Sequence, residues 1–164
     1  MNFWADAKQT QVTWAPGDPR LEALIVESSF PGLYALVHGD CVLKVGEAGT
    51  VRNGKRGTVG KRFSKHVKDG CAPEGSSYPG EFPAWWEFSG ALVGRELTIY
   101  TLRHDGPQSE RRALEKDAIY EAPGGQVLWE EMQRREAARI PGTKRPKRLV
   151  VPGSVRRRVL AELG

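Results

Sequence analysis

The stretch GLYALVHGDCVLKVGEAG, residues 32–49, decides the fold. Two apolar runs, 32–37 and 41–46, flank a turn sequence centred on Gly39, which is typical of an antiparallel β-hairpin. The polar, basic segment that follows, up to Gly60, predicts a loop. The hairpin is therefore the expected centre of a small antiparallel sheet.

The first strand of this hairpin carries Tyr34 and the second carries Lys44. A three-residue turn, residues 38–40, would place both side chains on one face. A two-residue turn, Gly39-Asp40, would shift the register by one and place them on opposite faces. Any chemistry shared by the two side chains requires the first arrangement.

Outside the hairpin, the periodicity predicts helices over 59–69, 110–121 and 126–139 and a third strand over 95–103. The expected fold class is α/β (α+β): a small three-stranded antiparallel sheet flanked by helices, in the order strand, strand, helix, strand, helix, helix. The chain divides into an N-terminal extension (1–30), a compact domain (31–140) with an insert (70–94), and a basic C-terminal arm (141–164) in which a short helix over 154–162 is expected.

Composition limits the function classes. No apolar run approaches the ~20 residues that span a bilayer, so we expect no membrane partner. The two cysteines are too few for a disulfide framework, which favours a reducing compartment and the cytoplasm as the default location. The net charge is +5, and residues 134–158 hold ten Lys and Arg against one acid. Residues 52–68 hold seven more and no acid, and two basic blocks indicate a polyanionic partner, or else solvated surfaces.

Two predicted helices carry polar residues beside apolar ones. Arg62 and His66 lie four apart, next to the stripe formed by Val59, Phe63 and Val67. An arginine at the edge of a core can donate two hydrogen bonds to phosphate oxygens. On spacing alone, however, a surface arginine is the simpler interpretation.

In the later helix, Glu115 lies in an apolar seam with Leu114, Ala118 and Ile119. A carboxylate there needs a partner, which is a salt bridge or a Mg²⁺ ion.

These residues occur in an order that resembles the GIY-YIG nuclease family, in its restriction-enzyme-like branch. GLY at 32–34 stands at the first family triplet and KVG at 44–46 at the second; Arg62 follows in the next helix and Glu115 in a helix after the third strand. The resemblance covers roughly residues 31–130. It implies a Mg²⁺-dependent endodeoxyribonuclease.

In that resemblance Tyr34 is the general base, directly or through a water, Arg62 stabilises charge on the phosphoryl group, and Glu115 holds one divalent metal ion. His66, four residues after the arginine, is similar to an arrangement in the restriction-enzyme branch. Since a tyrosine has a reference pKa of ~10, we expect Lys44, Arg62 and Mg²⁺ to favour its phenolate.

The chain departs from the family pattern at two positions. Lys44 replaces the second tyrosine, which changes how the phosphate or the base is assisted. The asparagine that follows the family glutamate has no match, and Gln126 is the nearest candidate.

Several polar residues are expected to bind the nucleic acid without a catalytic role. They are Arg52, Lys55, Arg56, Lys61, Lys65, Gln126, Lys144, Arg145, Lys147 and Arg148. Trp85 and Trp86 in the insert either stack on bases or, as is more common, pack the insert onto the core.

The resemblance thus implies a Mg²⁺-dependent enzyme that hydrolyses phosphodiester bonds of double-stranded DNA, with a small sequence-specific restriction enzyme as the leading subtype. A homodimer, or two successive nicks, would be needed to cut both strands. A phage or mobile-element nicking enzyme, an RNA- or structure-specific nuclease, and a non-catalytic nucleic-acid-binding module are the alternatives. Glu115 distinguishes a nuclease from the non-catalytic binding module, because a binding module has no need of a carboxylate beside phosphates.

Overall fold

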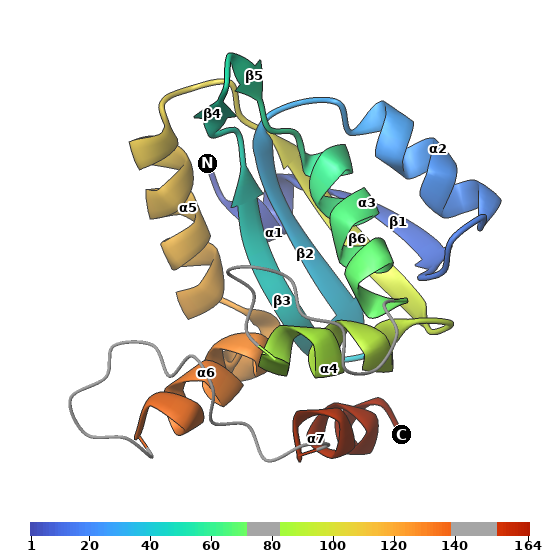
Figure 1. Cartoon of the computed structure of the whole chain (residues 1–164). Helices are drawn as coiled ribbons and strands as arrows, with labels where there is room; N and C mark the ends of the chain where they lie inside the picture. The colour runs from blue at the N-terminus through green and yellow to red at the C-terminus, as the bar shows by residue number, and fades with distance from the viewer. Residues whose placement is uncertain (72–82, 139–153) are drawn as a thin grey trace.

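The computed structural model describes residues 1–71, 83–138 and 154–164. Its centre is a four-stranded antiparallel sheet in the spatial order β1-β6-β2-β3 (Figure 1). The strands are β1 (Lys8–Thr13), β2 (Gly32–His38), β3 (Cys41–Ala48) and β6 (Glu96–Arg103). Because β3 stands at an edge of the sheet, groups on both sides of that edge can reach its side chains.

The mixed α/β fold class is confirmed, but the expected count of three strands was wrong. The fourth strand is β1, which lies in the N-terminal extension and pairs with β6 from Lys8 opposite Thr101 to Thr13 opposite Glu96. Only Val12 of its six residues is buried. An edge strand with a single buried side chain carries almost no apolar alternation, and this explains why the sequence pattern did not reveal it.

The β2–β3 hairpin combines a two-residue turn with a bulge. His38 pairs with Cys41, so the turn is Gly39-Asp40 and the three-residue turn was wrong. The register then shifts between Leu36 and Val37 in β2, and Leu36 pairs with Lys44. Leu43 is the extra residue, and a bulge of this kind changes the face of every residue beyond it.

As a result of the bulge, Tyr34 lies opposite Gly46, two residues along β3 from Lys44. Residues two apart in a strand share a face. Tyr34 and Lys44 therefore point to the same side of the sheet, as expected, although by a different register.

Helices cover both faces of the sheet. On the Tyr34 face lie α2 (Pro19–Glu27) and α3 (Val59–Gly70), whose buried stripe is the predicted one. Asp18 and Thr58 cap their first turns through side-chain oxygens that accept Leu21 and Lys61 amides at 3.0 and 3.2 Å. On the other face lie α1 (Phe3–Asp6) and α5 (Gln108–Tyr120).

Two helices close the far end of the Tyr34 face where the sequence predicted an insert and an arm. The insert contains α4 (Pro83–Leu92), and the last part of the arm is α7 (Ser154–Leu163), which packs on it. Val155, Val159 and Leu163 are buried in the core. The expected short helix is confirmed, but it is part of the core and does not extend into solvent with the arm.

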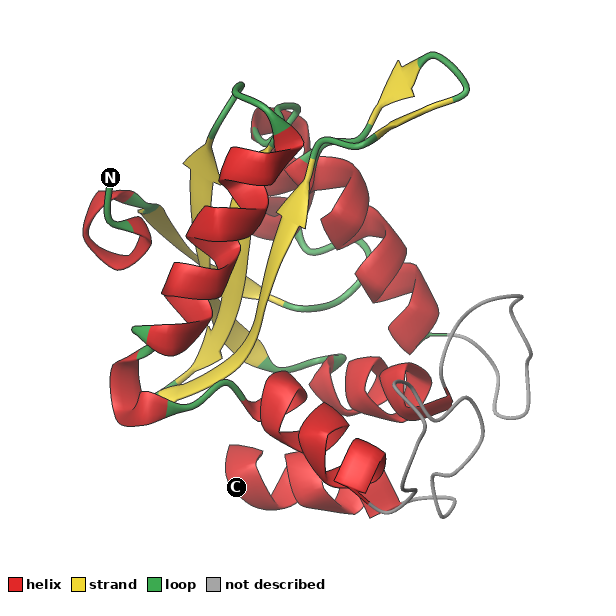
Figure 2. Cartoon of the chain, turned by 90° about the vertical axis from the view of Figure 1, so that its left-hand side faces the viewer, coloured by secondary structure: helices red, strands yellow, loops and turns green. Residues whose placement is uncertain are grey.

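The remaining elements are a short 3₁₀ turn, one helix and a small separate ribbon. After α5, a short 3₁₀ turn (Pro123–Gly125) leads into α6 (Leu128–Ala138). In place of the loop predicted before Gly60, β4 (Val51–Arg52) and β5 (Lys55–Arg56) form a separate two-stranded ribbon. Figure 2 shows this ribbon projecting away from the body of the protein. Among the described residues, no helix is long and apolar enough to cross a bilayer.

Candidate active site

A buried tyrosine–histidine pair lies between the sheet and α3. The Tyr34 hydroxyl oxygen is 2.6 Å from His66 Nε2, and the two side chains are 2% and 7% exposed. Phe63, one turn before His66, packs edge-on against the Tyr34 ring with centroids 5.2 Å apart. Both partners are thus held by the core, and their bond needs no rearrangement to form.

Gly46 makes room for the tyrosine. A Cβ atom at this position would stand 2.5 Å from Cζ and 2.8 Å from Cε1 of Tyr34, and closer still to its hydroxyl oxygen. The ring therefore crosses β3 where β3 has no side chain. This explains the glycine in KVG by a contact within the site.

Gly46→Ala is expected to destabilise the protein by about 1–3 kcal/mol, because the methyl group overpacks the site. It should also displace the Tyr34 hydroxyl from His66 and lower any activity that depends on the pair. Gly90→Ala is the matched control, since a Cβ there finds its nearest neighbour at 3.6 Å. Equal unfolding free energies for both variants would contradict the proposed packing of Tyr34.

Lys44 approaches the pair from β3 and lies among aromatic rings. Its Nζ is 5.1 Å from the centroid of Trp85 and 5.7 Å from that of Trp129. Trp85 is buried, and its indole N–H donates to Asp69 Oδ2 at 3.0 Å. For Trp85 the packing interpretation therefore holds, and the ring faces confine the ammonium group by cation–π attraction.

Arg62 and Glu115 carry opposite charges that both act on Tyr34. Arg62 lies on α3 one turn before His66, and Glu115 on α5; both are half-buried. Within the described part of the chain, neither side chain forms an ion pair or a side-chain hydrogen bond. Each lies close enough to change the pKa of Tyr34, in opposite directions. A half-buried guanidinium and a half-buried carboxylate that lack a partner among the described residues could each bind a ligand of opposite charge.

The protonation states follow from burial. Burial raises the pKa of Tyr34 well above 10; the Arg62 charge opposes this and the Glu115 charge adds to it. Burial also lowers the pKa of His66 well below 6.5, and the charges of Lys44 and Arg62 lower it further. At neutral pH the pair is therefore a phenol and a neutral imidazole. Arg62 lowers the pKa of Tyr34 as expected, but in the protein alone desolvation outweighs this effect and the phenol form prevails.

The pKa of His66 predicts a pH-dependent contribution to stability. The unfolded chain binds a proton near pH 6.5 and the folded state does so only at lower pH, so this contribution is lost as pH falls through that window. His66→Gln removes the titrating group. We expect the difference in unfolding free energy between wild type and this variant to shrink between pH 7.5 and 5, as followed by denaturant unfolding. A constant difference would contradict the buried neutral imidazole.

An ion pair attaches α5 to β3. Arg111 is 1% exposed, and its Nε donates to Glu47 Oε2 at 3.1 Å. Gln108 Nε2 also donates to Glu47 at 3.4 Å. Glu115 lies one helical turn beyond Arg111 on the same helix, so this bond sets its position relative to β3. Sequence reasoning missed Glu47 and Arg111, because a buried arginine has the same spacing in a helix as an exposed one.

Glu115 also fits a divalent cation. Burial raises the pKa of its carboxyl group, and the charges of Glu47 and Glu130 raise it further, whereas Lys44 lowers it. A cation would relieve the repulsion between these carboxylates. Among the described residues no group of three or more His, Cys, Asp or Glu side chains could hold a metal ion. Mg²⁺, however, often takes only one or two carboxylates together with water and substrate phosphate oxygens.

The predicted nucleic-acid-binding residues fall in several places. Arg52, Lys55 and Arg56 are exposed on the β4–β5 ribbon, and Lys61 and Lys65 are exposed on α3. Lys144, Arg145, Lys147 and Arg148 lie outside the described residues.

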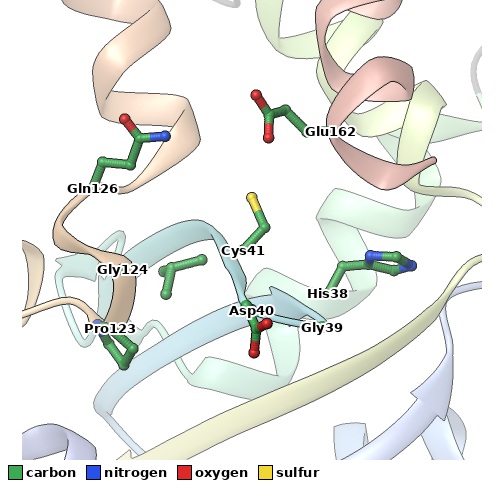
Figure 3. A pocket seen from close by; sticks show the side chains of 9 residues that line it. His38, Gly39, Asp40, Cys41, Pro123, Gly124, Gln126 and Glu162 are labelled. Atoms are coloured by element: carbon green, nitrogen blue, oxygen red, sulfur yellow. The ribbon is translucent and has the colours of Figure 1, made fainter.

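Gln126 lies apart from Glu115, at the opposite end of the sheet from the ribbon. It lines an open pocket of about 350 Å³ beside the β2–β3 turn. Figure 3 shows Gln126, which precedes α6, and Glu162 of α7 on separate segments around Cys41. The residues that line this pocket do not include Tyr34, Arg62, His66 or Glu115.

Comparisons with family models, with curated proteins and with solved structures found no match. The function of this site thus has to be inferred from its own geometry.

Proposed function

We propose that this chain is a Mg²⁺-dependent DNA endonuclease that hydrolyses phosphodiester bonds, of the sequence-specific restriction-like type. The observation that carries the proposal is a pair of opposite charges, Arg62 and Glu115, which have no partner among the described residues and which both act on the pKa of Tyr34, the residue that bonds to His66. A phosphodiester in the presence of Mg²⁺ supplies both missing partners, an anion and a cation. The GIY-YIG resemblance expected from the sequence assigns roles to the same four residues.

Arg62 would bind the scissile phosphate. Its planar guanidinium can donate two parallel hydrogen bonds to phosphoryl oxygens, and its half-buried position strengthens that attraction. Lys44 would add positive charge from the neighbouring strand, with its ammonium group confined by Trp85 and Trp129. These groups bind the substrate and stabilise the charge that develops on the phosphoryl oxygens.

Glu115 would hold the Mg²⁺ ion. When bound, Mg²⁺ supplies charge stabilisation at the phosphoryl and leaving oxygens. Its carboxylate would be the anionic ligand for the ion, and the Arg111–Glu47 bond fixes the helix that carries it.

Tyr34 and His66 would move the proton of the attacking water. Because Tyr34 is a neutral phenol, it can accept that proton only as its own passes along the 2.6 Å bond to His66 Nε2. His66 is neutral at pH 7 and can therefore receive it. The positive charges that lower the pKa of His66 are the ones a bound phosphate neutralises, and substrate binding thus makes the transfer easier.

A non-catalytic DNA-binding module on the same fold is the alternative from a different class. A carboxylate beside DNA phosphates would weaken binding by repulsion, and Glu115 has no ion pair within the described chain to offset this. A metal-dependent nuclease has a use for that carboxylate. A phage or mobile-element nicking enzyme remains a variant of the same proposal.

A mixed-sequence duplex library tests the proposal. The purified protein is incubated with the library, with Mg²⁺ and with a chelator, and the product ends are sequenced. We expect Mg²⁺-dependent ends that share a short motif. Binding without cleavage would favour the module, and cleavage without a motif would favour a non-specific or nicking enzyme. Double-strand breaks would further require a homodimer or two successive nicks.

A further inference from the structure

The β4–β5 ribbon has a preformed shape. Val51 pairs with Arg56 and Arg52 with Lys55, around a tip in which Asn53 and Gly54 have φ angles of 51° and 73°. Two central residues with positive φ define a type I′ turn, for which Asn-Gly is the preferred sequence. The ribbon thus has a locally determined conformation although it packs against little else.

The base of the ribbon is attached on both sides. The Gly57 amide donates to the Thr50 carbonyl at 3.0 Å, and Gln108 Nε2 at the start of α5 donates to Thr50 Oγ1 at 2.7 Å. Arg56 donates to the carbonyl oxygen of Asp105 at 3.2 Å. These bonds fix the direction in which the ribbon leaves the body of the protein (Figure 2).

The projecting part is exposed and positively charged. Residues 51–56 are all exposed, including Val51 at 62%, so the ribbon contributes almost nothing to the core. Arg52 and Lys55 stand directly opposite each other and therefore share one face. No acidic residue occurs between 52 and 68. This surface is complementary to a polyanion.

The ribbon also adjoins the candidate active site along the chain. β4 follows β3, which carries Lys44, and β5 leads through Gly57 and Thr58 into α3, which carries Arg62. The ribbon and Arg62 are therefore close along the chain, and a nucleic acid whose phosphate lies at Arg62 would pass near the ribbon.

We propose that the β4–β5 ribbon enters the major groove of duplex DNA and reads base edges through Arg52, Asn53 and Lys55. This inference rests on the proposed nuclease function. The major groove of B-DNA, about 12 Å wide, admits a two-stranded ribbon, and arginine, lysine and asparagine match the hydrogen-bonding edges of guanine and adenine there. A-form RNA has a major groove that side chains cannot read, so the partner is duplex DNA.

The test compares two charge-matched double variants. Arg52→Ala with Lys55→Ala removes the two cationic side chains that share one face of the ribbon and keeps the Asn53-Gly54 turn. Lys8→Ala with Arg20→Ala removes two exposed cations near the β1 edge of the sheet. Each protein is incubated with a randomised duplex library and Mg²⁺, and product ends are sequenced. Binding to three ligands is measured by fluorescence anisotropy without metal: a DNA duplex with the preferred motif, an unrelated DNA duplex, and an RNA duplex.

We expect the ribbon variant to lose discrimination at some motif positions, by about 5- to 150-fold for each lost base contact, whereas the control variant keeps the wild-type motif. An unchanged motif, with binding weakened equally on all duplexes, would mean that the ribbon holds only the backbone and would overturn the proposal. Wild-type cleavage without any motif would overturn it as well. A wild-type protein that neither cuts nor binds DNA would overturn the nuclease function itself and this inference with it.

Discussion

Tyr34→Phe should cleave duplex DNA about 10² to 10⁴ times more slowly than wild type, because it removes the oxygen that accepts the proton of water. The substitution keeps the ring that packs over Gly46 and against Phe63. It leaves His66 Nε2 without its partner, which should cost about 1–3 kcal/mol of stability. DNA affinity should stay near the wild-type value, and single-turnover cleavage separates this effect from binding.

The matched control is Tyr100→Phe, which deletes the same oxygen from a half-buried tyrosine on β6, on the opposite face of the sheet. We expect it to cleave at the wild-type rate. Equal rates for Tyr34→Phe and Tyr100→Phe would remove the phenol from the mechanism.

The pH dependence of cleavage separates proton transfer to His66 from a phenolate mechanism. If the phenolate were required, the rate would rise about tenfold per pH unit up to the raised pKa of Tyr34. Transfer to His66 requires a neutral imidazole, and this form prevails above pH 6.5 because its pKa is lowered. We therefore expect a wild-type rate that is nearly constant between pH 7 and 9. A tenfold rise per unit would contradict the transfer.

Glu115→Gln should lower cleavage by several orders of magnitude while DNA binding survives or improves. The amide keeps the size of the side chain but removes the anionic ligand for Mg²⁺ and the negative charge near phosphate. Glu121→Gln makes the same chemical change on an exposed residue just after α5 and should leave both properties unchanged. A Glu115→Gln variant with near-normal cleavage would exclude this carboxylate from the reaction.

The elements with strong periodicity could be predicted from the sequence, and those that depend on distant contacts could not. The helix α3 and the strand β6 each bury one regular face, and the hairpin shows as two apolar runs around a turn, which the pattern reveals. The segment that forms α4 buries Trp85, Phe88 and Leu92 at helical spacing, but the Pro-, Gly- and Ser-rich composition around it predicted an insert instead. Its helix forms because α3 and α7 pack against it.

The residues of the candidate site could also be predicted only in part. Tyr34, Lys44, Arg62, His66 and Glu115 were named from their order along the chain, and the structure brings their charges close together. The bulge at Leu43 that keeps Lys44 on the Tyr34 face leaves no mark in the alternation of an almost fully buried hairpin. Burial itself, which reverses the expected direction of the Tyr34 pKa, depends on the tertiary packing of α3 and α4.

The most direct measurement of the central proposal is the conversion of supercoiled plasmid to nicked and linear forms by wild type and Glu115→Gln purified in parallel. Both are incubated with Mg²⁺, and a third sample holds wild type with a chelator. We expect conversion only by wild type with Mg²⁺. Equal conversion by Glu115→Gln, or conversion by wild type in chelator, would contradict a metal-dependent nuclease site at Tyr34, Arg62 and Glu115.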